Sequence, residues 1–83
     1  MPFHLYILFS KKLDRFYVGA TGNLQKRLEK HLNSSAGFTS KARDWTLIYS
    51  EEYERKEDAF KREKQIKLWK SRKMIEALID KEV

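Results

Sequence analysis

The stretch from Tyr17 to His31 carries residues suited to holding a phosphate. Arg27 and His31 follow Leu24 at i+3 and i+7 in a segment with helical periodicity, which places both beside the buried stripe rather than opposite it. A cation at the edge of a core needs an anion. Gly19 is expected to end a strand where only a small residue lets backbone or ligand come close, and the first N–H groups of the helix beyond it suit phosphate. Strand, glycine turn and arginine-bearing helix together predict a phosphate-handling site.

Glu63 is the second residue in an unusual position. Seven basic residues surround this one acid between positions 61 and 73: Lys61, Arg62, Lys64, Lys67, Lys70, Arg72 and Lys73. Its helical neighbours at i−4, i−3 and i+3 are apolar: Ala59, Phe60 and Ile66. The carboxylate therefore lies in the middle of a face expected to be buried, where an ionised glutamate is costly unless it is paired or binds a metal. The sequence leaves both explanations open, with Arg27 or a lysine as the ion-pair partner.

The elements that must position these residues begin with three predicted strands: Phe3–Phe9, Arg15–Val18 and Trp45–Tyr53. The first is apolar on both faces, which is typical of a central strand. A polar turn joins it to the second, so the two should form an antiparallel hairpin. Tyr6 and Tyr17 are then expected on adjacent strands.

Three segments have helical periodicity: Leu24 to Leu32, Lys56 to Lys70, and Arg72 to Asp80. Ser71 is expected to cap the last of them. Residues 38–43 should form a short helix or an ordered loop that carries Lys41 and Arg43. No repeat, low-complexity tract or linker separates these segments.

Length and composition limit the kind of site. The 83 residues are expected to form one domain, 1–83, with room for one core and one site. The lack of cysteine excludes a disulfide framework and a thiolate zinc site, so only hard, oxygen-loving metals fit. The longest apolar run, Leu5–Phe9, is too short to span a bilayer, and no leader precedes it. We therefore expect a cytoplasmic protein with no membrane attachment.

The charge balance favours a polyanionic partner. Lys and Arg number 18 against 12 Asp and Glu, a net charge of +6, which is typical of proteins that bind nucleic acid. The basic residues between positions 61 and 73 either contact DNA or form a solvated face. Their place beside the candidate phosphate site favours DNA contact.

These residues together resemble the GIY-YIG nuclease superfamily, and within it the small stand-alone bacterial branch. Four runs carry the resemblance in order: Leu5-Tyr6-Ile7, Tyr17-Val18-Gly19, Arg27-Leu28-Glu29-Lys30-His31 and Arg62-Glu63-Lys64-Gln65-Ile66-Lys67. Each run alone is common, but their order and spacing over nearly the whole chain are specific. His4 and Leu5 stand where the first motif has glycine and isoleucine, while the motif tyrosine is in place as Tyr6.

The resemblance implies an α+β fold, a three-stranded antiparallel sheet flanked by helices, that cleaves DNA phosphodiesters with one divalent ion, Mg²⁺ or Mn²⁺. It assigns catalysis to four positions, Tyr6, Tyr17, Arg27 and Glu63, to which we add His31 as a further catalytic candidate. Glu63 would be the metal ligand, and one carboxylate suffices because Mg²⁺ keeps most of its waters and takes a further oxygen from the substrate phosphate. Arg27 would hold the scissile phosphate and offset charge in the transition state.

One tyrosine would take the proton from the attacking water. A phenol with a pKa of about 10 is a poor base at neutral pH, so nearby positive charge must lower that pKa. We expect Tyr6 to be the base and Tyr17 its hydrogen-bonding partner, while the reverse assignment and a covalent tyrosine route stay open. His31 would orient a tyrosine or the phosphate. DNA contacts are expected from six residues: Gly19, Lys41, Arg43, Lys64, Lys67 and Lys70.

The sequence thus predicts a monomeric, metal-dependent DNA endonuclease, structure-guided or directed by a protein partner, that acts on branched or single-stranded DNA in repair or recombination. Two alternatives remain. One is a nucleic-acid-binding module that keeps the fold with little or no catalysis, and the other is an adaptor for a repair complex. The complete residue set favours the enzyme, because a relic would be free to lose Glu63 or Arg27.

Overall fold

The computed structural model describes residues 2–33 and 44–81, which form three strands and three helices. In chain order they are β1 (Phe3–Ser10), β2 (Arg15–Thr21), α1 (Leu24–Asn33), β3 (Thr46–Tyr53), α2 (Lys56–Trp69) and α3 (Arg72–Asp80). The predicted α+β class and the three-stranded sheet are confirmed.

The strands form one antiparallel sheet in the order β2-β1-β3, so β1 is central as its apolar sequence predicts. In the middle of the sheet, Ile7 pairs with Val18 of β2 and with Tyr49 of β3. The register between β1 and β3 shifts by one residue after Ile7. Because β2 lies at one edge of the sheet, side chains from both layers can meet around it.

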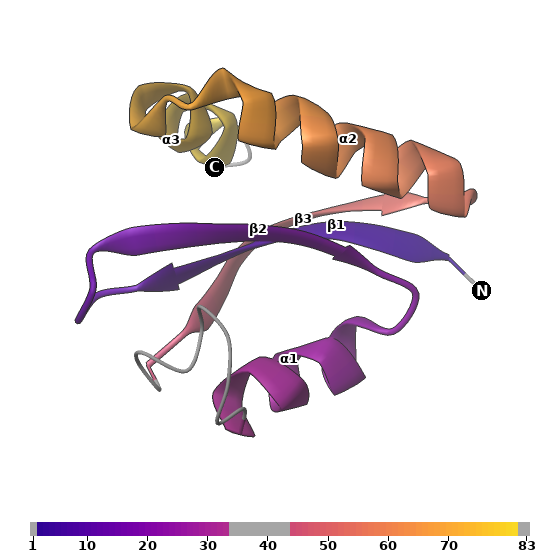
Figure 1. The fold of residues 1–83 in the computed structure, drawn as a ribbon, viewed down its shortest axis with the longest axis horizontal. Helices are drawn as coiled ribbons and strands as arrows, with labels where there is room; N and C mark the ends of the chain where they lie inside the picture. Colours follow the sequence, from indigo (N-terminus) through magenta and orange to yellow (C-terminus); the bar gives the residue numbers. More distant parts are fainter. Residues whose placement is uncertain (1, 34–43, 82–83) are drawn as a thin grey trace.

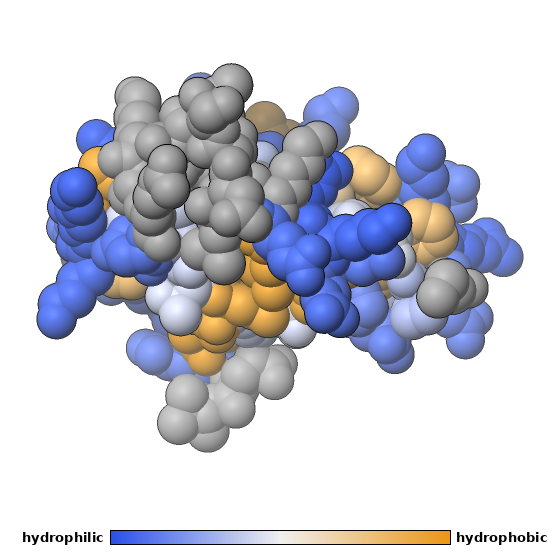
Figure 2. Space-filling model, turned by 90° about the horizontal axis from the view of Figure 1, so that it is seen from below, coloured by the Kyte–Doolittle hydropathy of each residue, from blue (hydrophilic) through white to orange (hydrophobic). Residues whose placement is uncertain are grey.

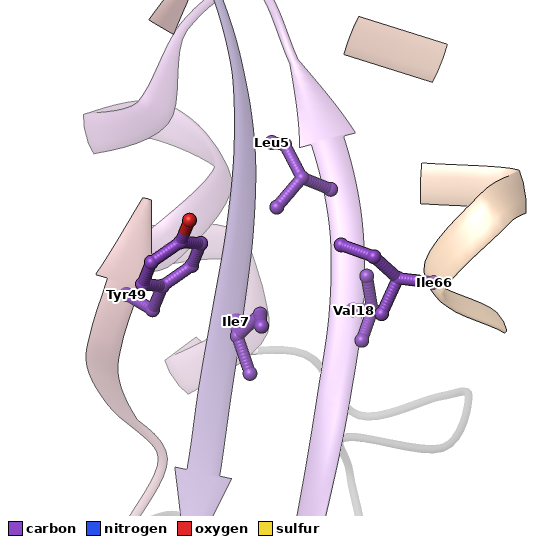
Figure 3. Close-up of a cluster of buried hydrophobic side chains, with 5 residues drawn as sticks. All are labelled: Leu5, Ile7, Val18, Tyr49 and Ile66. Atoms are coloured by element: carbon purple, nitrogen blue, oxygen red, sulfur yellow. The ribbon is translucent and has the colours of Figure 1, made fainter. Parts of the chain in front are cut away.

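The helices cover the two faces of the sheet unequally, with α1 on one side and α2 and α3 on the other (Figure 1). Alternate side chains of β1 serve the two layers. Leu5 and Ile7 are fully buried against α2 and α3, where Ile66 of α2 points toward Val18 (Figure 3). On the other face, a second cluster holds Tyr6, Leu8 and Trp45, with Leu24 and Leu28 of α1 packed against it. Each face of the sheet therefore has its own small core.

The predicted end of the second strand is wrong. Gly19 does not end β2: it is buried within the strand and pairs with Tyr6, and pairing continues to Thr21 opposite His4. The physical reason is the length of β1, which offers hydrogen-bonding partners along eight residues. The chain leaves the sheet only after Thr21, whose hydroxyl accepts a hydrogen bond from the Asn23 N–H at 3.1 Å.

Polar contacts fix the turn between β1 and β2. Asp44, just before β3, accepts hydrogen bonds from the Ser10 hydroxyl at 2.6 Å and from the Lys12 N–H at 2.9 Å. Arg72 at the start of α3 donates to the Asp14 carboxylate at 2.8 Å and lies over the Phe16 ring. Asp14 itself has a φ of 53°, a left-handed conformation that aspartate tolerates in turns. The hairpin turn is thus held by two residues distant in sequence, one just before β3 and one at the start of α3.

Viewed from the side of α1, much of the surface is hydrophilic, and a hydrophobic area lies near the middle of this face (Figure 2). Within residues 2–33 and 44–81, none of the helices is long and apolar enough to cross a lipid bilayer.

Candidate active site

The two motif tyrosines lie side by side on neighbouring strands. Their ring centroids are 6.4 Å apart and the rings are tilted by 32°. Tyr6 is 1% exposed, while Tyr17 nearer the edge is only partly buried and meets the Trp45 ring edge-on at 6.4 Å. Tyr17 is therefore the member of the pair that a ligand can approach from the β2 edge.

Gly19 is required by Tyr6. A Cβ at position 19 would overlap the hydroxyl and ring of Tyr6, its partner in the register. The absence of a side chain therefore lets the tyrosine lie flat against the sheet. The prediction that a phosphate approaches the Gly19 backbone stays a prediction.

Arg27 comes from α1, on the same side of the sheet as Tyr6. The helix is positioned by Asn23, whose carbonyl accepts from the Arg27 N–H at 3.1 Å and whose side-chain oxygen accepts from the Lys26 N–H at 3.0 Å. This is an N-cap, and it uses one of the N–H groups that the sequence offered to phosphate. The Arg27 guanidinium is partly buried and near enough to lower the pKa of Tyr6.

Glu63 comes from α2, in the opposite layer. Its carboxylate is 19% exposed and accepts a hydrogen bond from Lys67 Nζ at 2.9 Å, one helical turn further on. The same ammonium lies 5.9 Å from the centre of the Tyr17 ring. Because Tyr17 belongs to the cluster that faces α1, the side chain of Lys67 extends from α2 past the β2 edge of the sheet to contact it. Of the ion pairs that the sequence allowed, the one with a lysine is the one found in the described residues.

The surroundings of Tyr6 oppose the phenolate form that a base requires. Burial raises the pKa of Tyr6, the neighbouring Tyr17 raises it further, and Glu63 adds to this direction, so Arg27 does not compensate. A phenol whose pKa lies above its ordinary value is deprotonated at neutral pH to an even smaller extent than free tyrosine. The assignment of Tyr6 as the base therefore stays a prediction, and it requires positive charge that the protein alone does not supply.

The predicted DNA contacts divide between two grooves. Lys67 and Lys70 line what we call the hairpin groove, about 620 Å³ between the β1–β2 turn and the α2–α3 junction, formed by residues 13–18, 66, 67, 70–72 and 75. Lys64 lines a different groove, which includes Tyr53 of β3. Lys41 and Arg43 lie outside the described residues. His31 falls in the last turn of α1, and its side chain also lies outside them.

Two arginines of the basic stretch have structural partners. Arg62 donates to Glu51 at 3.0 Å and lies over Trp69, and Arg72 is held by Asp14. Ser71 caps α3 as predicted, accepting from the Met74 N–H at 3.3 Å. The face predicted around Glu63 also needs one correction. Phe60 is 40% exposed, because α2 turns only Ala59 and Ile66 fully toward the sheet.

Sequence analysis missed the position of Lys67 between Glu63 and Tyr17. The spacing Glu63 to Lys67 was a usable signal, because a glutamate four residues before a lysine forms a favourable pair on a helix. It also missed Glu51, which holds Arg62. No local pattern marks that contact, because it joins residues of β3 and α2.

The donor set near the tyrosines suits one hard divalent cation. Within the described part of the chain, no three His, Cys, Asp or Glu residues gather as a metal cage. Glu63 is the carboxylate present, partly buried and paired only with an exposed lysine among those residues. A single carboxylate fits Mg²⁺ or Mn²⁺ that keeps its waters and binds substrate phosphate, and does not fit a structural zinc.

Fold and site together define a class: a small α+β domain in which two sheet tyrosines, an arginine and a carboxylate from separate elements lie near one basic edge. The catalytic-domain model of the GIY-YIG family matches residues 2–76, and the chain belongs to that family. The resemblance seen in the motifs is thereby confirmed.

A solved structure supports the same assignment. The chain is similar to the UPF0213 protein BH0048 from Bacillus halodurans, determined by NMR in solution, with 27% sequence identity and a TM-score of 0.61. The match covers 96% of this chain and 84% of that one. Among curated protein sequences, none matches this chain.

Proposed function

We propose that this protein is a metal-dependent endonuclease that hydrolyses DNA phosphodiester bonds. One observation carries the proposal: the Lys67 ammonium that pairs with Glu63 of α2 lies over the ring of Tyr17, so the carboxylate and the two tyrosines come together at the β2 edge of the sheet. A partly buried carboxylate whose partner is one exposed lysine is costly to keep for packing alone. It is useful where a cation and a phosphate must be held together.

Arg27 binds the scissile phosphate in this proposal. Its guanidinium lies on the α1 side near Tyr6, so it approaches the phosphate from one layer while Lys67 and Lys70 approach from the other. A planar guanidinium donates two parallel hydrogen bonds to phosphate oxygens and offsets the charge that develops on them. Arg27 would therefore both position the phosphate and stabilise its negative charge.

Tyr17 is the proton acceptor that this geometry favours. It is less buried than Tyr6, and the Lys67 ammonium lies over its ring. A partly buried tyrosine at the sheet edge can be reached by the attacking water, whereas the burial that raises the pKa of Tyr6 opposes its phenolate. Tyr6 then holds Tyr17 in place and lines the site, which reverses the roles expected from the sequence.

Glu63 would hold the Mg²⁺ or Mn²⁺ ion. When bound, such an ion polarises the phosphoryl oxygen and stabilises the charge of the leaving group. The family implies a nucleic-acid substrate, and we propose DNA, with branched or single-stranded forms favoured. A protein partner that directs the cut and a role in repair or recombination are part of the same proposal.

Cleavage assays with three variants test this function. Purified protein with Mg²⁺ or Mn²⁺ should nick flapped, branched or single-stranded DNA. Glu63→Gln keeps the side-chain shape and should abolish cleavage while binding persists. Tyr17→Phe should slow cleavage on the order of a hundredfold or more, and Tyr6→Phe should slow it less. Lys56→Met, at the exposed start of α2 and outside the predicted DNA contacts, is the control and should cut like wild type.

A binding module is the second candidate, and a specific observation favours it. In the free protein Lys67 is paired with Glu63, and burial raises the pKa of Tyr6, which keeps its hydroxyl protonated. If the wild type binds DNA but no divalent ion supports cutting of any substrate, this candidate replaces the enzyme. Cutting by Glu63→Gln at the wild-type rate would reject the catalytic assignment as well.

A further inference from the structure

Lys67 lies between two residues that the proposed reaction needs. Its Nζ is 2.9 Å from Glu63 Oε2 and 5.9 Å from the centre of the Tyr17 ring. An ammonium in that position has one positive charge beside the carboxylate that would hold a divalent ion. Lys67 and that ion therefore compete for the same oxygen.

The ion pair is of an exchangeable kind. The Lys67 side chain is 53% exposed, and the pair lies along one helix face at i and i+4. Exposed pairs of this type contribute little stability, because water and salt screen them and the lysine pays entropy to stay in place. The cost of separating Lys67 from Glu63 is therefore small.

A second partner for Lys67 would come with the substrate. Lys67 and Lys70 line the hairpin groove beside Tyr17, together with Arg15. A DNA phosphate drawn into this groove is an acceptor that lysine binds readily through rotation of its flexible side chain. Once Lys67 turns to the phosphate, Glu63 loses its cation.

We propose that Lys67 is a positioning residue that holds Glu63 in the free protein and moves to a DNA phosphate on binding, so that substrate opens the metal site. The inference rests on the proposed function and adds its order of events. Metal affinity is low without DNA and rises when DNA is present. Coupling of this kind is reciprocal, so the divalent ion also tightens DNA binding.

The test measures Mn²⁺ binding by electron paramagnetic resonance in the absence of DNA. Lys67→Met removes the competing charge and keeps the length of the side chain, so Mn²⁺ should bind about three- to tenfold tighter than to wild type. Lys64→Met removes the same net charge from the same helix but not from the pair, and should change the affinity less than twofold. Lys67→Arg keeps the cation and should stay close to wild type.

Two further measurements test whether Glu63 is the group that binds Mn²⁺ and whether DNA binding and metal binding are coupled. Adding Glu63→Gln to Lys67→Met should remove the gain in Mn²⁺ affinity, because Glu63 is the group released. With saturating single-stranded DNA, checked for integrity in the same samples, wild type should gain Mn²⁺ affinity, and Lys67→Met should gain clearly less.

The proposal is overturned if Lys67→Met binds Mn²⁺ no tighter than Lys64→Met, or if the gain survives Glu63→Gln. It also fails if Lys67→Arg binds as tightly as Lys67→Met, since charge would then not be the cause. These readouts do not depend on cutting. A protein that never cleaves DNA but shows the gain rejects the proposed function alone, and one that cleaves without the gain rejects the role of Lys67 alone.

Discussion

Two carboxylates, one in β3 and one in α2, have different hydrogen-bonding partners. Glu51 of β3 accepts hydrogen bonds from the Tyr53 hydroxyl at 2.6 Å, from Arg62 Nε at 3.0 Å and from the Tyr49 hydroxyl. Glu63, adjacent in sequence to Arg62, is paired in the described residues with one exposed lysine. Both side chains are about one-fifth exposed, at 18% and 19%. Burial therefore does not distinguish them, whereas their partners do.

We propose that this difference separates an acid that holds the fold, Glu51, from one that serves the reaction, Glu63. Burial raises the pKa of the Glu51 carboxyl. The hydrogen bonds from Arg62, Tyr49 and Tyr53 together lower this pKa by more than burial raises it, so the net pKa is below the ordinary value. Burial, and after it the hydrogen bond to Glu51, raise the pKa of Tyr53 to about 12. A carboxylate with its acceptor sites filled is fixed, and one held by a mobile ammonium is available to a ligand.

The largest effect on stability should come from removing the carboxylate of Glu51, which accepts several hydrogen bonds. Glu51→Ala leaves Arg62 and two tyrosine hydroxyls without their acceptor, which should cost about 2–3 kcal/mol of unfolding free energy. Chemical denaturation measures it. Glu52→Ala, at the next position of β3 with a side chain 69% exposed, is the matched control and should cost less than about 0.5 kcal/mol. Equal costs at the two positions would contradict the structural role of Glu51.

A second prediction concerns the tyrosine side of the comparison. Gly19→Ala forces a methyl group into the space of the Tyr6 ring, so the protein should lose about 1–3 kcal/mol of stability. Gly22→Ala meets only the edge of Phe3, at 3.0 Å, and should be better tolerated. Thermal unfolding of the two variants gives the comparison. If Gly19→Ala is as stable as wild type, Tyr6 does not need the glycine.

The sequence predicts the strands and helices better than it predicts the contacts made by the candidate site residues. The strands and helices follow from apolar periodicity and from Ser71 as a cap, which are local signals. Even so, Gly19 looks like a strand end, because only pairing with Tyr6 shows that β2 continues.

Contacts between elements account for what the sequence could not show. The pKa of Tyr6 depends on burial and on charges from two helices, and Glu51 meets Arg62 only after β3 and α2 pack together. The family motifs indicate which residues matter. They do not indicate which tyrosine is buried or which cation stands beside Glu63.

The smallest expected effect is a pH dependence of stability. Because the folded pKa of Glu51 is lowered, its contribution is fully present above the unfolded value of about 4.3 and is lost as pH falls through the folded pKa. The stability difference between wild type and Glu51→Gln should therefore be constant from pH 6 to about pH 5 and shrink toward pH 3. Denaturation curves over that range measure it. A difference that grows on acidification would contradict the lowered pKa.

The central claim is that Glu51 holds the fold while Glu63 serves the reaction, and Glu51→Gln and Glu63→Gln test it side by side. Each variant is measured twice, by its unfolding free energy and by its rate of DNA cleavage with Mg²⁺ at a temperature where both are folded. We predict that Glu63→Gln stays within about 0.5 kcal/mol of wild type and does not cut, and that Glu51→Gln loses about 1–2 kcal/mol and still cuts. A Glu63→Gln variant that cleaves like wild type, or that is destabilised as much as Glu51→Gln, would contradict the claim.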